Sequence, residues 1–249
     1  MSNNAGRAAP RQNNPLYIEQ TTAATSLASK IGREIVGGAF KEQAVLPNEI
    51  IMRGRYNVSR TALREAYSKL TAKGLLLPRP KVGTCIRGRE HWNMLDQDVL
   101  SWHLQTLPAS DIAADLYELR KMIEPGAAEL AALKRTDADI DRIDAAFADM
   151  RAFSGNETDL VDADYGFHVA ILEATHNPFI NAFSALIRAA MISTFELSWR
   201  GAEIIKETRL EQHGAVAEAI RAKNPQLAST RMERLLEDSM RDVEEALKH

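Results

Sequence analysis

The fold is decided by Leu46–Ile86, LPNEIIMRGRYNVSRTALREAYSKLTAKGLLLPRPKVGTCI. This stretch predicts two short helices followed by a two-stranded hairpin. Pro47 suits the first turn of the first helix, where its missing N–H costs nothing. Residues 50–52, Ile-Ile-Met, are expected to form the apolar side of that helix, and residues 55–57 are the predicted turn.

The second helix is expected to begin after Ser59, which stands where an N-cap belongs, and to stop at Gly74. At about 100° per residue, its apolar side chains gather on one side. They are Val58, Ala62, Leu63, Ala66, Tyr67 and Leu70. The opposite arc holds Arg60, Thr61, Arg64 and Ser68. Long arginine side chains can reach phosphates and the edges of guanine, and the short hydroxyl side chains between them let a helix lie deep in a major groove.

Two short strands, at 75–78 and 83–87, follow the second helix, and the tip between them is basic. The whole stretch therefore predicts a winged helix-turn-helix. A solvated surface charge is a fair interpretation of any single arginine, but it does not explain the ordered set of turn, cap, polar arc and basic hairpin. The predicted DNA contacts are Ser59, Arg60, Thr61, Arg64, Ser68, Arg79, Lys81 and Gly83.

These motifs, Leu46-Pro47-x-Glu49, Val58-Ser59-Arg60-Thr61-x-x-Arg64-Glu65-Ala66, Leu70-x-x-x-Gly74 and Gly83-Thr84, resemble the DNA-binding domain of GntR-type bacterial transcription regulators. The resemblance implies that Arg60, Thr61 and Arg64 contact the operator. The family often has a further basic contact just after the first motif. Here Ile50 follows Glu49, so one phosphate contact is absent, and the wing tip differs from the usual Gly-rich form.

Length and charge favour two domains. The 249 residues are 45% hydrophobic, which is enough for two cores. Residues 1–90 hold 15 Lys and Arg against 6 Asp and Glu, whereas residues 91–249 hold 16 against 28. A basic head on an acidic body is expected when only one domain touches nucleic acid.

The lone cysteine, Cys85, excludes an intramolecular disulfide, and we interpret it as a buried wing residue rather than a redox sensor. The sequence has no apolar run of 18 residues and no secretory leader, so a cytoplasmic protein is expected.

The predicted organisation is a mobile arm at 1–20, the winged helix-turn-helix at 21–88, a linker at 89–94 and an all-helical effector-binding and dimerisation domain at 95–249. The fold class is therefore mainly α, with the second domain an antiparallel helical bundle around a cavity. Its predicted helices are 95–106, 110–134, 136–153, 158–175, 178–199, 206–223 and 225–247. Pro125 lies inside the second of these helices, where a kink is expected.

One set of side chains in the second domain is suited to a metal ion. Asp164 and His168 are four residues apart and therefore share a helix face, and His213 could add an imidazole from another helix. Nitrogen and oxygen ligands of this kind suit Zn, Ni or Mn, with Zn the default. By spacing alone, an Asp and His pair is more often a surface hydrogen bond.

The pattern Asp164-x-x-Phe167-His168, followed by His176-Asn177-Pro178 and His213, resembles the ligand-binding domain (FCD) of the FadR branch of GntR regulators. The resemblance implies a helical bundle in which one Asp and three His hold a metal against a carboxylate effector. The position of the third His is taken by Leu235. The other three side chains either hold a metal with help from water or effector oxygens, or hydrogen-bond a polar effector directly.

Arg120, in Leu119-Arg120-x-x-x-Glu124, matches an arginine that reaches an effector carboxylate in this family; the alternative is an ion pair with Glu124. Four further motifs resemble the sugar-acid-responsive repressors of the branch: Trp92-Asn93-x-Leu95-Asp96-x-Asp98-Val99-Leu100-x-Trp102, the pair Glu124-Pro125, His176-Asn177-Pro178 and Phe195-Glu196-x-x-Trp199. This implies a hexonate effector such as galactonate, with Thr194, Ser198 and Trp199 near its hydroxyls. Trp199 could equally be a core residue.

The sequence therefore predicts a homodimeric transcriptional repressor that binds an inverted repeat in double-stranded DNA and is released by a small sugar acid. One rival is a regulator of the same branch that answers to another carboxylate, such as lactate, pyruvate or an acyl group, through a metal. The other rival is a metal-dependent enzyme built on Asp164, His168 and His213. No general base is evident beside that trio in the sequence, so we expect that the chain is not an enzyme.

Overall fold

The computed structural model describes residues 23–152, 157–198 and 207–246. The chain forms two compact units, Met1–Trp102 and His103–His249. The linker predicted at 89–94 lies earlier than this division, because Trp92, Val99 and Trp102 are part of the core of the first unit. The arm predicted at 1–20 lies outside the described residues.

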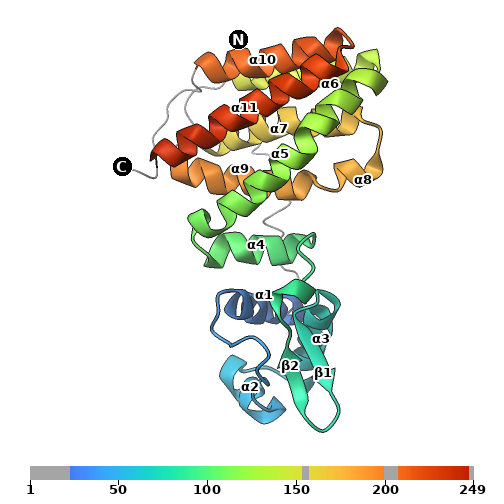
Figure 1. Ribbon diagram of the computed structural model, residues 1–249. Helices are drawn as coiled ribbons and strands as arrows, with labels where there is room; N and C mark the ends of the chain where they lie inside the picture. The colour runs from blue at the N-terminus through green and yellow to red at the C-terminus, as the bar shows by residue number, and fades with distance from the viewer. Residues whose placement is uncertain (1–22, 153–156, 199–206, 247–249) are drawn as a thin grey trace, which may run out of the picture. The chain divides into compact units, whose positions relative to one another are not determined.

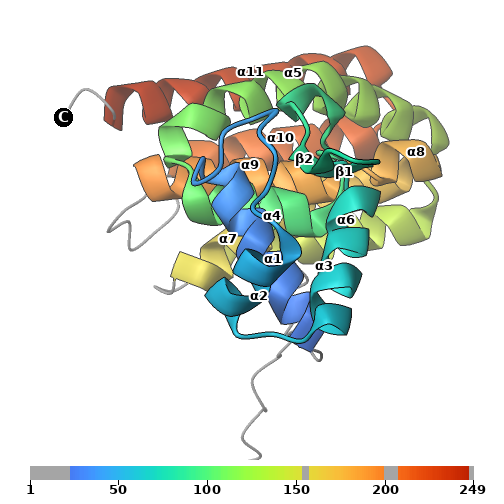
Figure 2. The ribbon, with the colours of Figure 1, turned by 90° about the horizontal axis from the view of Figure 1, so that it is seen from below.

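The first unit has the predicted winged helix-turn-helix order (Figures 1 and 2). Its elements are α1 (Ala23–Val36), α2 (Glu49–Tyr56), α3 (Arg60–Ala72), β1 (Leu76–Arg79), β2 (Gly83–Ile86) and the short η1 (Arg89–His91). The apolar side chains of α1 that repeat at helical spacing, Leu27, Ile31, Ile35 and Val36, are all buried. They pack against Leu63, Ala66 and Leu70 of α3, which confirms the predicted inner face of that helix.

The ends of α3 are set as the sequence predicts. The Ser59 hydroxyl oxygen accepts a hydrogen bond from the Ala62 N–H at 3.1 Å. Asn57, in the turn before it, is left-handed with φ of 52°. Gly74 follows the helix with φ of 82°, and a Cβ there would lie 2.1 Å from the His91 carbonyl oxygen. Only glycine fits both the backbone angle and the space at this stop.

The predicted apolar side of α2 was wrong at two of its three positions. Ile50 is 79% exposed and Ile51 is 56% exposed, whereas Met52 is fully buried. Because α2 begins at Glu49 with Asn48 as its N-cap, the inward positions are Met52 and, four residues later, the partly buried Tyr56. The two isoleucines therefore point to the surface.

The wing is an antiparallel hairpin in which Leu76 pairs with Ile86 and Arg79 with Gly83. The segment before α2 extends it, because the Leu46 N–H donates to Thr84 and the Ile86 N–H donates to Ala44. Cys85 is buried in β2, as predicted. The tip between the strands leaves the side chains of Arg79 and Lys81 exposed.

Helix α4 (Gln97–Thr106) starts later than the predicted 95–106 because Asp96 caps it. The Asp96 carboxylate accepts from the N–H groups of Asp98 and Val99. The same carboxylate pairs with Lys73, at the end of α3. These contacts tie the end of α3 to the beginning of α4.

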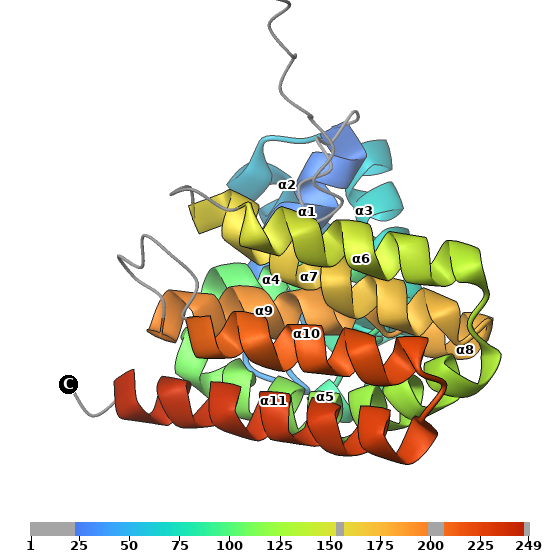
Figure 3. The same ribbon diagram turned by 90° about the horizontal axis from the view of Figure 1, so that it is seen from above.

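The described part of the second unit consists of helices alone, which confirms the predicted bundle (Figures 1 and 3). They are α5 (Ala109–Lys134), α6 (Asp137–Arg151), α7 (Glu157–Ala174), α8 (Pro178–Asn181), α9 (Ser184–Ser198), α10 (Glu207–Arg221) and α11 (Pro225–Ala246). The long α5 packs against α11, α9, α7 and α10, α6 packs against α7, and α10 packs against α11. None of the described helices is long and apolar enough to cross a membrane.

One predicted helix of the second unit is divided into two in the structure. The single helix expected at 178–199 was wrong: α8 ends at Asn181, and a tight turn in which the Phe183 N–H donates to Ile180 precedes α9. Asn177 caps the short α8, and Pro178 occupies its first turn. Helix α5 continues past Pro125, which is buried.

Candidate functional site

The first candidate site is the outer face of α3. Arg60, Thr61, Arg64 and Ser68 are all exposed there, opposite the buried face of the helix. The Ser59 oxygen accepts the capping bond and keeps its O–H to donate. With the exposed wing residues Arg79, Lys81 and Gly83, this face presents the eight predicted contacts to solvent, and the hydroxyls and guanidinium groups among them suit phosphates and base edges.

A carboxylate lies between the two arginines of this face. Glu49, in the first turn of α2, pairs through Oε1 with Nε of Arg60 at 2.8 Å and through Oε2 with Nε of Arg64 at 3.8 Å. Both arginine side chains remain more than 60% exposed. In the sequence Glu49 is recognisable only as part of the Leu46-Pro47-x-Glu49 motif, and its pairs with the two arginines were not predicted.

The second candidate site is a buried polar centre in the helical unit. Arg120 and Glu124 are one turn apart on α5, and both are almost completely buried. Nε of Arg120 donates to Oε1 of Glu124 at 2.5 Å. Burial opposes the charge on Glu124, but Arg120 and His168 outweigh it and lower the pKa of Glu124 to about 2. The ion pair considered as the alternative role of Arg120 is therefore present.

Glu124 also binds His168 of α7 through its other carboxylate oxygen, which contacts Nδ1 of the imidazole. A terminal nitrogen of Arg120 lies 3.4 Å from Nε2 of the same ring. Burial acts to lower the pKa of His168, but Glu124 and Asp164 outweigh it and raise the pKa. Glu124 thus fixes both the guanidinium and the imidazole.

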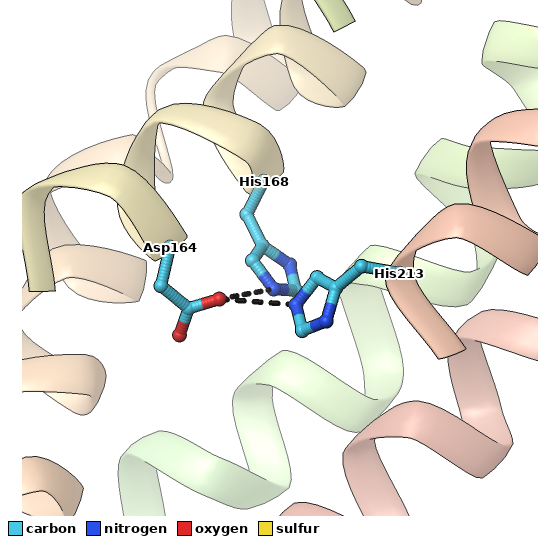
Figure 4. Close-up of side chains that lie close together, drawn as sticks. All are labelled: Asp164, His168 and His213. Atoms are coloured by element: carbon cyan, nitrogen blue, oxygen red, sulfur yellow. Dashed lines mark hydrogen bonds and ion pairs between the residues drawn. The ribbon is translucent and has the colours of Figure 1, made fainter. Parts of the chain in front are cut away.

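Asp164, His168 and His213 meet as the sequence predicted (Figure 4). Oδ1 of Asp164 lies 3.0 Å from Nε2 of His213, on α10, and 3.5 Å from Nε2 of His168. The two imidazoles stand edge to face with centroids 5.5 Å apart, and the ring of Phe167 packs on both. Burial would raise the pKa of Asp164, but hydrogen bonds from the two histidines hold it well below its usual value.

The outer nitrogens of both histidines have acceptors. Nδ1 of His213 lies 2.7 Å from the Arg209 carbonyl oxygen, which can only accept, so this nitrogen carries a proton. Nδ1 of His168 likewise faces the ionised Glu124. Nε2 of His213 therefore faces Asp164, and Nε2 of His168 faces both Asp164 and a terminal nitrogen of Arg120. The two Nε2 atoms can donate a second proton to Asp164, or each can offer a lone pair to a cation held together with the carboxylate.

This arrangement fits a divalent metal. The three ligand atoms lie within 4.8 Å of one another, and each imidazole has its other N–H fixed by a carboxylate or a carbonyl, as metal-binding histidines usually do. Leu235, at the position of a further histidine in the resembling family, is buried in the apolar core. Three protein ligands would leave positions for ligand oxygens.

The remaining residues predicted near an effector are Thr194, Ser198 and Trp199. Thr194 lies on α9, and its hydroxyl donates within the helix, to the carbonyl of Ala190 at 2.9 Å. Trp199 and the side chain of Ser198 lie outside the described residues. Glu124 was predicted only as the partner of Arg120. Its place one turn after Arg120 is a local signal that the two side chains share an environment. Its contact with His168 joins α5 and α7, and such a contact between two helices leaves no local trace in the sequence.

An exposed arginine face on a winged helix-turn-helix, together with a helical bundle that contains a buried polar centre, is the arrangement expected of a DNA-binding regulator with a second, helical domain. The family model for bacterial regulatory proteins of the gntR family matches residues 23–86, and the FCD domain model matches residues 115–238. The chain therefore belongs to the GntR family of transcriptional regulators, in the branch that carries an FCD domain.

Similar proteins extend over most of the chain. It is 32% identical over 212 residues to the uncharacterized HTH-type transcriptional regulator YieP of Escherichia coli, covering 83% of this chain and 90% of that protein. It is 30% identical over 215 residues to the galactonate operon transcriptional repressor of Escherichia coli, covering 86% and 94%. A solved structure of Lar, which controls expression of the Listeria monocytogenes agr system, matches with a TM-score of 0.63 at 17% identity over 92% and 99% of the chains.

These relatives and domains are those of DNA-binding regulators rather than enzymes, as expected from the sequence. A carboxylate does lie beside the trio, contrary to the expectation from sequence, but it is ill-suited to be a general base. Glu124 is paired with Arg120 and has a pKa of about 2, far below that of a group poised to accept protons near neutral pH.

Proposed function

We propose that the chain is a homodimeric transcriptional repressor of a sugar-acid catabolic operon. Two copies of α3 would read an inverted repeat, since a two-fold protein matches a two-fold site. The observation that carries the proposal is the exposed face of Arg60, Thr61, Arg64 and Ser68 on a helix that is capped and packed as a recognition helix. Arg79, Lys81 and Gly83 of the wing would add backbone contacts.

The effector in this proposal is a sugar acid such as galactonate, bound at the buried polar centre of the helical unit. Similarity to the galactonate operon transcriptional repressor over most of the chain supports the class of acid. Arg120 would pair with the carboxylate, and Thr194 and Trp199 would lie near the hydroxyls. Binding that favours a dimer geometry unsuited to the operator would weaken DNA affinity by the coupling free energy, about 1–3 kcal/mol in typical cases.

A second candidate effector is a short carboxylate, such as lactate, pyruvate or an acyl group, held through a metal. The close approach of Asp164, His168 and His213, with the outer N–H of each imidazole fixed, favours this candidate. These three residues would hold a divalent ion, with Zn the most suitable, and the ion would supply positive charge for ligand oxygens.

DNA reading is tested by gel retention of the duplex upstream of the chain's own gene. Arg64→Ala is expected to lose retention, because one guanidinium of the reading face is removed. Arg89→Ala is the matched control: Arg89 is an exposed arginine of the same unit, it pairs with Glu42, and it is not among the predicted DNA contacts. Normal retention by Arg64→Ala would contradict the assignment of the face.

The effector is tested by thermal denaturation with a panel of hexonates, hexuronates and short 2-hydroxy acids, with zinc and with a chelator. A ligand that binds only the native state raises the unfolding midpoint by mass action. A shift with one hexonate supports the sugar-acid proposal. A shift with a short acid alone, and only with zinc, would replace it by the second candidate.

A further inference from the structure

The arginines of α3 are held in a particular orientation. Nε of Arg60 lies 2.8 Å from Oε1 of Glu49, and Nε of Arg64 lies 3.8 Å from Oε2 of the same carboxylate, so Glu49 forms an ion pair with each arginine and the pair with Arg60 is the closer one. A guanidinium has five N–H donors in a rigid fork, and it can pair with two acceptors through its two terminal nitrogens or through Nε and one terminal nitrogen. Pairing of Nε with Glu49 leaves the terminal pair free.

The position of Glu49 makes this orientation independent of DNA. Glu49 lies in the first turn of α2, where the helix dipole favours a carboxylate. Asn48 fixes that turn, because its side chain accepts from the Ile51 N–H at 3.0 Å. The side chain of Glu49 is 35% exposed, and those of the arginines are exposed by 61% and 65%. The carboxylate thus sits at the base of the pair while both forks extend into solvent.

We infer that Glu49 is a positioning residue that presents the terminal N–H groups of Arg60 and Arg64 to guanine in the major groove. The terminal pair of a guanidinium matches the O6 and N7 acceptors of guanine. Each half-site of the operator therefore contains guanine opposite these arginines. The inference rests on the proposed DNA-reading role of α3 and adds to it the residue that orients the two arginines.

The charge of Glu49 supports a role in selection rather than in affinity. A carboxylate near DNA phosphates weakens sequence-independent binding, which depends on positive charge. Two arginines share this one carboxylate, so the cluster keeps a net charge of +1. Loss of Glu49 should therefore strengthen binding to all DNA and weaken the preference for guanine, whereas damage to the fold would weaken both.

The experiment selects duplexes from a pool with a random core of about 20 base pairs, using the full chain. Selected duplexes are sequenced, and affinities are then measured with each recurring guanine replaced by 7-deazaguanine, which lacks N7. The wild type is expected to lose at least about fivefold in affinity on this replacement, the lower end for a bidentate contact. Glu49→Gln is expected to lose less than twofold while binding random DNA more tightly.

Glu65→Gln is the matched control. Glu65 is an exposed carboxylate on α3 itself, so this variant has the same change of charge, and it is expected to keep the wild-type loss on 7-deazaguanine. The inference is overturned if Glu49→Gln keeps that loss as well, or if Glu65→Gln abolishes it equally. If the wild type selects no sequence, the proposed function fails and this inference fails with it. If the wild type selects a sequence without guanine, only the inference fails.

Discussion

Removing the carboxylate of Glu124 should be among the most damaging single changes in the helical unit. Glu124 is 0% exposed and Arg120 is 4% exposed, so Glu124→Ala leaves a buried guanidinium without its carboxylate partner. Breaking one side of a buried ion pair costs about 3–5 kcal/mol, because the remaining charge is neither solvated nor paired. His168 also loses the acceptor of its Nδ1 proton.

The expected loss can be separated into its parts by a second variant. Arg120→Met with Glu124→Leu removes both charges and keeps the volume filled, which is often neutral or stabilising. The double variant still leaves the His168 N–H without its acceptor, a loss of about 1–3 kcal/mol. It should therefore be more stable than Glu124→Ala although it carries one more substitution.

The assay is urea unfolding of the full chain in a chelating buffer, followed by circular dichroism. The control is Arg234→Ala, which removes an exposed partner of Asp238 at the same four-residue spacing and should cost no more than about 1 kcal/mol. A loss below about 1 kcal/mol for Glu124→Ala would refute the reasoning. So would a double variant less stable than the single one.

Three further changes test the backbone and a second carboxylate. Gly74→Ala should cost about 1–3 kcal/mol in urea unfolding, because of the left-handed φ and the His91 carbonyl beside it. Gly54→Ala, inside α2 with open space around it, should stabilise by about 0.5–1 kcal/mol, and equal effects would contradict both. Asp139 is buried; burial would raise its pKa, but bonds from Thr136 and His176 lower it below 3.8. The ionised carboxylate of Asp139 therefore stabilises the folded state above pH 3.8, and this contribution is lost as the pH falls through the lowered pKa. Asp139→Asn should be less stable at pH 7, with a difference that shrinks as pH falls below 3.8; a constant difference would contradict this.

The fold was predictable where local rules decide it. Ser59 and Gly74 mark the ends of α3 by capping and by backbone angle, and both signals lie within a few residues of the feature they set. Ile50 and Ile51 show the opposite case. Hydrophobicity suggested burial, but the helix begins at Glu49, so its phase turns both side chains outward.

The candidate site was predictable in its members but not in its connections. The four-residue spacing placed Asp164 and His168 on one face, His213 was considered as a third ligand from another helix, and the family resemblance supported the set. The contact of Glu124 with His168 joins residues 44 apart, and no periodicity within α5 or α7 records it. The same holds for Glu49 and Arg60, which belong to different helices.

The two candidate sites share one physical arrangement. In each, a carboxylate pairs with Nε of an arginine and lies beside a second cationic or imidazole group: Arg64, 3.8 Å away, for Glu49, and His168 for Glu124. Occupying Nε fixes the plane of the guanidinium and limits which of its N–H groups can meet a ligand. At the exposed site this costs little stability, since exposed pairs are weak, and its effect is on orientation. At the buried site the same geometry is also required for folding, because neither charge can be left unpaired. Substitution of Glu49 should therefore change recognition at nearly constant stability, whereas substitution of Glu124 should change both together.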